Sequence, residues 1–248
     1  MAWASGPDVW LALCMLIGAA LYSSVGHAGA SAYIALMALF GMPAAVMRPT
    51  ALVLNMIVAS LASVRFVRAG MFRWRTLWPF LVTALPMSFV GAAIQLPTTV
   101  YRPLLGVVLL LSAARLLWPK PIRALAAWSD PPIPLALLAG AGIGLLSGLT
   151  GTGGGIFLSP LLLFLAWSAP KPAMGVAAVF VLANSISGLL GNLTSVRELA
   201  PALPLYAGAV LIGAVLGTIM GIRMTSPWIL RALALVLLIA GVKLIGLY

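Results

Sequence analysis

The residues best suited to chemistry form a glycine-rich run inside the apolar stretch 135–167, and they are Gly151, Thr152, Gly153, Gly154 and Gly155. Each glycine disfavours helix by about 1 kcal/mol relative to alanine, so the run predicts a helix break. Backbone groups freed within a membrane must be covered by protein or line a polar cavity. The helix expected from Ile156 onward places its N-terminus at the break, and helix N-termini attract anions. We interpret the run as half of an anion site; the alternative is that the glycines only allow close helix packing.

A second interruption, residues 23–31, breaks the apolar run 11–40, and its candidate site residues are Gly26, His27, Gly29 and Ser31. The pieces on either side are short for a hydrocarbon core of about 30 Å, which predicts two short helices that meet at a break. His27 is the chain's single histidine. An imidazole titrates near neutral pH, so His27 could bind an anion or carry a coupled proton. The alternative is a neutral histidine that bonds carbonyls freed by the break.

Two asparagines, Asn55 and Asn184, occupy equivalent places in two later apolar spans. A buried amide needs hydrogen-bond partners, which a substrate or the backbone of a break could supply. Ser187 adds a hydroxyl near Asn184, although serine in membrane helices often bonds its own helix backbone. The predicted substrate-binding residues are therefore Gly26, His27, Gly29, Ser31, Asn55, Gly151, Thr152, Gly153, Gly154, Gly155, Asn184 and Ser187.

The composition indicates a polytopic membrane protein, because 63% of the 248 residues are hydrophobic and only 7% are charged. The net charge of +11 comes mostly from basic residues between the apolar runs, as is typical of cytoplasmic loops. We therefore expect a multi-pass protein of the inner (plasma) membrane, with the lipid bilayer and not nucleic acid as its partner. Arg48 and Arg102 lie at span starts, where we expect long basic side chains to reach the headgroups.

The few acidic residues exclude several functions. Asp8, Asp130 and Glu198 lie in or near predicted loops, and a cation pump usually needs a carboxylate within the membrane. The chain has no His/Asp/Glu constellation for metal or general-base chemistry, and the glycine run lacks the Lys-Ser/Thr ending of a nucleotide-binding loop. We expect neither an enzyme nor a cofactor, a metal site or an ATP-driven pump.

The two halves of the chain repeat each other. Gly26 aligns with Gly151 and Asn55 with Asn184 at an almost constant offset. Each half reads as a broken short pair followed by three spans, which are 43–64, 76–96 and 101–118, then 173–192, 202–221 and 228–247. We expect an all-α fold with a first repeat, a cytoplasmic linker and a second repeat over residues 1–118, 119–134 and 135–248. Such repeats are common in secondary transporters, which bind substrate where the repeats meet.

Residues 144–161 read GLLSGLTGTGGGIFLSPL. This segment resembles the signature of the TauE/SafE family of sulfite and organosulfonate exporters, also called the toluene-sulfonate uptake permease family. The resemblance extends over the whole chain through its length, its repeat and the positions of both breaks. The first half departs from the signature, because His27 and Ala28 interrupt the glycines and Ala35 aligns with Pro160. The resemblance implies a secondary transporter of a small anion, such as sulfite, a sulfonate or a related sulfur oxyanion.

Two arrangements of the halves follow from the broken pairs. If each pair is a hairpin, each half has an odd number of segments and the second half is inverted; if each pair is one broken crossing, the halves are parallel. The distribution of Lys and Arg favours inversion by a narrow margin. Alternating access about a central site needs two opposed gates, which inverted repeats supply. We expect this mechanism, with a passive anion or small-solute channel as the alternative; the pattern specifies no oligomeric state.

Overall fold

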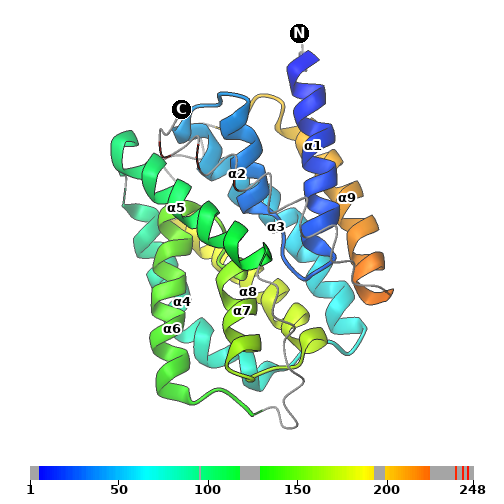
Figure 1. Cartoon of the computed structure of the whole chain (residues 1–248), viewed down its shortest axis with the longest axis vertical. Coiled ribbons are helices and arrows are strands. Elements are labelled where there is room, and N and C mark those ends of the chain that lie inside the picture. The colour runs from blue at the N-terminus through cyan, green and yellow to red at the C-terminus, as the bar shows by residue number, and fades with distance from the viewer. Residues whose placement is uncertain are drawn as a thin grey trace.

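The computed structural model describes residues 6–94, 96–117, 129–192 and 199–223, with the isolated positions 238, 242 and 245. Within these residues the regular structure is helical, which confirms the all-α class (Figure 1). The helices of the first half are α1 (Gly6–Ser23), α2 (Ala30–Leu39), α3 (Ala44–Arg68), α4 (Trp74–Ala93) and α5 (Thr98–Leu117). Those of the second half are α6 (Ile133–Thr150), α7 (Gly155–Phe164), α8 (Pro170–Gly191) and α9 (Leu203–Arg223). The expected final span, 228–247, and linker residues 119–128 lie outside the described residues, apart from the isolated positions.

Six of these helices are long and apolar enough to cross a membrane, and they are α1, α3, α4, α6, α8 and α9. The chain is therefore a multi-pass membrane protein. The two helices of each broken pair differ in length: α1 and α6 have 18 residues each, just enough to cross a membrane, whereas α2 and α7 have 10. Helix α1 begins at Gly6 and so includes Asp8, which looked like part of a polar start, and the Asp8 carboxylate accepts a 2.6 Å hydrogen bond from Tyr206 Oη.

The first broken pair is a hairpin. Ser31 Oγ donates to Tyr22 Oη at 2.9 Å, and farther from the break Gly18 faces Ala32 and Leu36. Helix α2 therefore returns along α1 in the opposite direction. In Figure 1, α1 runs down the view and α2 runs up, whereas α6 runs up and α7 runs down. The second pair thus reverses direction in the same way as the first, and neither pair forms a single broken crossing.

Glycines bring two pairs of helices into backbone contact. Gly144 and Gly148 of α6 lie against the carbonyls of Ala84 and Ser88 in α4. Gly217 of α9 lies in the same way against the carbonyl of Ala20 in α1. A side chain at any of these glycines would meet backbone atoms, so these glycines set how close the helices approach.

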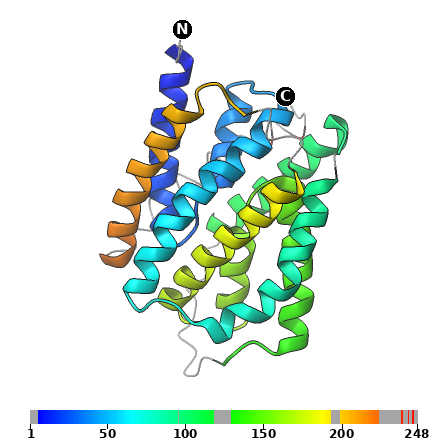
Figure 2. The same ribbon diagram turned by 180° about the vertical axis from the view of Figure 1, so that it is seen from behind.

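Helices α3 and α8 lie between these two pairs (Figure 2). They run antiparallel. Asn55 of α3 bonds Ser185 of α8, whereas Leu52, which precedes Asn55 in α3, packs against Gly188, which follows Ser185 in α8. The two halves use the same helix contacts, if α1 to α4 of the first half are matched in order with α6 to α9 of the second. Thus α1 packs on α9 as α6 packs on α4, and α2 packs on α3 as α7 packs on α8.

Candidate functional site

Both predicted breaks occur, and their glycines hold backbone torsions that other residues rarely adopt. The left-handed positions are Gly26 (φ +82°), Gly29 (+104°), Gly151 (+78°), Gly153 (+75°) and Gly154 (+77°). Gly155 is different, because it begins α7 and packs against Val181 of α8. The local structure of each break therefore follows directly from its glycine content.

The two breaks meet. His27 Nε2 lies 2.9 Å from Gly155 O, and since a carbonyl only accepts, Nε2 carries the proton and donates it. A small cavity with room for about one water molecule lies at this junction. Its lining comes from both breaks, from the helix ends beside them and from α8, and it includes His27, Gly29, Ser31, Thr152, Gly155 and Val181.

Four more predicted residues border this junction. Asn55 lies beside Gly153, where a side chain would collide with the Asn55 amide. Asn184 lies beside Gly154, so that a Cβ at Gly154 would come within 3.4 Å of Asn184 Nδ2. Both asparagines thus lie beside the second break, and a side chain at Gly153 or Gly154 would meet them.

Three predicted residues lie away from the cavity. A side chain at Gly26 would meet the backbone of Met174, so this glycine permits close packing with α8. Gly151 lies against Arg48. Ser187 Oγ donates to Leu85 O at 2.6 Å and so joins α8 to α4. The structure does not bring these residues to the place where the breaks meet.

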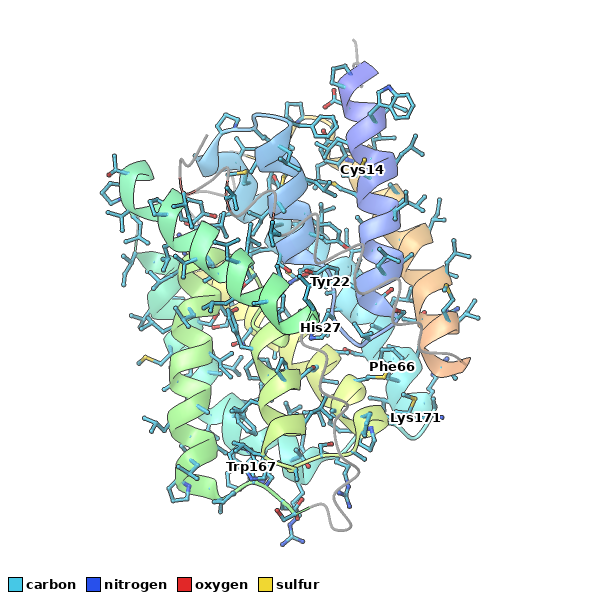
Figure 3. All side chains as sticks on the ribbon, viewed as in Figure 1. Cys14, Tyr22, His27, Phe66, Trp167 and Lys171 are labelled. Atoms are coloured by element: carbon cyan, nitrogen blue, oxygen red, sulfur yellow. The ribbon has the colours of Figure 1, made fainter. Side chains whose placement is uncertain are left out.

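Two tyrosines at the site are not among the residues predicted from the sequence. Tyr22 is buried, lines the cavity and stands edge-on to His27 with ring centroids 6.1 Å apart (Figure 3). Tyr33 is also buried, and its Oη donates to Ala28 O at 2.6 Å, which satisfies a carbonyl freed by the first break. Their signal in the sequence is a phenol on each side of a break, in a run that is otherwise apolar.

The expectation that Arg48 reaches the headgroups is wrong. Only 7% of Arg48 is exposed, and its Nη2 donates to Ala92 O at 2.7 Å and to Gly148 O at 2.6 Å. Nη1 adds a 3.3 Å bond to Ile94 O. These acceptors belong to the last turns of α4 and α6 or follow them, where carbonyls have no partner within their helix. Arg48 therefore caps two helix C-termini beside the second break, a role that suits a cation at the negative ends of helix dipoles.

The hydroxyl protons at the second break are used in hydrogen bonds within the protein. Thr150 Oγ1 donates to Leu146 O at 2.6 Å, one turn earlier in α6. Thr152 Oγ1 lies 2.9 Å from Thr150 Oγ1 and must supply the proton of that bond, because Thr150 has only one. Of these residues, Thr152 lines the cavity, and it offers oxygen lone pairs there.

The chain matches a family model described as "Sulfite exporter TauE/SafE" over residues 11–244. It belongs to the TauE/SafE family. The chain is also 37% identical over 241 residues to "Probable membrane transporter protein y4hK" of Sinorhizobium fredii, an alignment that covers 96% of this chain and 98% of the relative. No solved structure matches the chain.

Membership in the TauE/SafE family establishes a membrane transporter, and both descriptions concern transport rather than catalysis. It also confirms the family expected from residues 144–161, a segment that contains the second break. The match extends over both halves of the chain, so both breaks lie within the matched region.

Proposed function

We propose that this TauE/SafE protein moves a small anion, namely sulfite, an organosulfonate or a related sulfur oxyanion, by alternating access around the two helix breaks. The observation that carries the proposal is the junction between the breaks, where His27 of the first half bonds Gly155 of the second at one cavity. A site shared by two halves can open to one side when the halves move one way and to the other side when they move back.

The electrostatics of the junction favour an anion. Helices α2 and α7 both begin there, at Ala30 and Gly155, and helix N-termini carry partial positive charge. The two described carboxylates are engaged elsewhere, since Asp8 bonds Tyr206 and Asp130 pairs with Arg75 at 3.2 Å. An anion at the breaks would thus meet oriented dipoles, with no described carboxylate lining the cavity to repel it.

The size of the cavity fits an enclosed state of such a transporter. Sulfite and sulfonates are larger than the single water that the cavity has room for. Substrate binding would therefore require the breaks to separate. Because α2 and α7 are short helices that begin at glycine-rich breaks, they are the elements best placed to move.

Inverted repeats fit the same mechanism. The counterpart helices α3 and α8 run antiparallel at the centre, and exchange of the halves preserves the packing pattern. We therefore assign residues 1–118 and 135–248 to two inverted repeats joined by a cytoplasmic linker, 119–134. Two gates of similar construction would then lie on opposite faces of the membrane.

A ligand panel tests the anion class. Purified protein is heated with sulfite, sulfate, thiosulfate, taurine, sulfoacetate and simple carboxylates, and the melting temperature is recorded. A ligand that binds only the folded protein raises that temperature with its concentration. We expect stabilisation by sulfite or a sulfonate and none by acetate. Stabilisation by carboxylates alone would contradict the sulfur-oxyanion assignment.

A further inference from the structure

The two equivalent asparagines differ in their hydrogen bonds. Both are fully buried, Asn55 on α3 and Asn184 on α8. Asn55 Oδ1 accepts a bond from Ala30 N at 2.9 Å, and its Nδ2 donates to Ser185 Oγ at 3.2 Å. Asn55 thus caps the first amide of α2 and ties the first break to α8.

Asn184 makes neither kind of bond. Within the part of the chain that the structure describes, its Oδ1 and its Nδ2 have no hydrogen-bond partner. Its backbone carbonyl, in contrast, has a partner, because it accepts a 3.1 Å hydrogen bond from Ser88 Oγ. A buried amide without partners destabilises the folded protein, so a residue kept in this state points to a partner that comes from outside the chain.

The unpartnered amide lies against the second break. A Cβ at Gly154 would lie 3.4 Å from Asn184 Nδ2, and the same Cβ would touch Ile143 and Phe180 at 3.0 Å. The counterpart of the Ala30 amide, which Asn55 caps, is the amide of Gly155 at the start of α7. Asn184 makes no bond to that amide, so the N-terminus of α7 lacks the side-chain cap that α2 has.

We infer that Asn184 is the side chain that binds the transported anion, whereas Asn55 has a structural role. This inference rests on the proposed function. Nδ2 of Asn184 donates to an oxygen of the anion, and the first amides of α7 donate to the same group. Such bonds between a neutral donor and an oxyanion are strong, and they supply the partner that the buried amide lacks. A Cβ at Gly153 or Gly154 would already meet neighbouring atoms, so the anion reaches Asn184 only when the breaks separate.

Matched leucine variants separate the two roles. Asn184→Leu and Asn55→Leu replace each amide by an apolar group of similar size in the full-length protein. Melting temperatures are measured without ligand and with sulfite, and sulfite uptake is measured in proteoliposomes. Without ligand, we expect Asn55→Leu to melt several degrees lower because α2 loses its cap, and Asn184→Leu to melt at or above the wild-type temperature. With sulfite, we expect Asn184→Leu to lose the stabilisation and to raise KM at least about tenfold.

Each result decides between roles. If Asn184→Leu melts lower without ligand but keeps the sulfite response, Asn184 is structural and the inference is wrong. If Asn55→Leu folds and loses the sulfite response while Asn184→Leu keeps it, the roles are reversed. If the wild-type protein responds neither to sulfite nor to any other anion of the panel, the proposed function fails, and the assignment of Asn184 to the anion fails with it.

Discussion

At the scale of single residues, three glycines of the second break hold left-handed torsions, and they are Gly151, Gly153 and Gly154. A side chain at Gly153 would also strike the Asn55 amide. We expect Gly153→Val and Gly154→Val each to lower the transport rate by more than about tenfold, because a β-branched residue resists the torsion and fills the site. Gly142→Val is the matched control, since this glycine of α6 faces open space. Uptake assays that find the three variants equally active would reduce the break glycines to packing residues.

Arg48 provides a second prediction, about stability. Its guanidinium caps carbonyls of both α4 and α6 in a buried place. We expect Arg48→Leu to lower the free energy of unfolding by about 3 kcal/mol, because the capped carbonyls lose their partner. Arg75→Leu is the control, since 85% of that side chain is exposed and its ion pair with Asp130 contributes little. Thermal unfolding of the two variants checks the difference, and equal melting temperatures would show that the buried contacts of Arg48 do not stabilise the fold.

His27 carries the prediction about proton coupling. Its Nε2 donates to Gly155 O, a bond that a glutamine amide can also make. If uptake is coupled to protons, protonated His27 pairs with the anion, so uptake is fastest at low pH and falls as the pH rises. We expect His27→Gln to retain sulfite binding but to lose this dependence between about pH 5.5 and 7.5. A glutamine variant with the full pH dependence of the wild type would assign His27 a structural role only.

At the scale of elements, the breaks before α2 and α7 face one cavity. Ser31 and Thr152 both line it, one from each break. Cysteines at these two positions, in a Cys14→Ser background, should therefore crosslink with a short bifunctional thiol reagent. The pair Ser31→Cys and Ser187→Cys is the control, because Ser187 faces α4 instead. Crosslinking of the control pair alone would show that the breaks do not meet in the membrane.

The elements also show what the sequence can predict. Both breaks are predictable, because consecutive glycines disfavour helix wherever they occur. The inclusion of Asp8 in α1 is not predictable, because its partner Tyr206 lies far away in the sequence. The burial of Arg48 depends in the same way on carbonyls from α4 and α6. The contrast between Asn55 and Asn184 is hidden altogether, since equivalent residues in repeated spans look alike until their partners are known.

At the scale of the whole molecule, two glycine-packed pairs, α1–α9 and α4–α6, flank the central α3 and α8. Arginines of α3 bond both pairs, because Arg48 reaches α4 and α6 while Arg65 Nη1 donates to Val215 O at 3.0 Å in α9. The close backbone contacts within each pair favour movement of the pair as one body. Movement between such bodies, around a site where the breaks meet, is what alternating access requires.

Counterflow in proteoliposomes distinguishes alternating access from passive conduction. Vesicles that contain the purified protein are preloaded with unlabelled sulfite, and the initial entry of radiolabelled sulfite is compared with entry into empty vesicles. An alternating-access transporter returns to the outside faster when it carries substrate, so the account predicts faster entry into preloaded vesicles, saturation with external sulfite, and loss of both effects in Gly154→Val. Entry that neither saturates nor responds to preloading would contradict the account and would identify a passive channel.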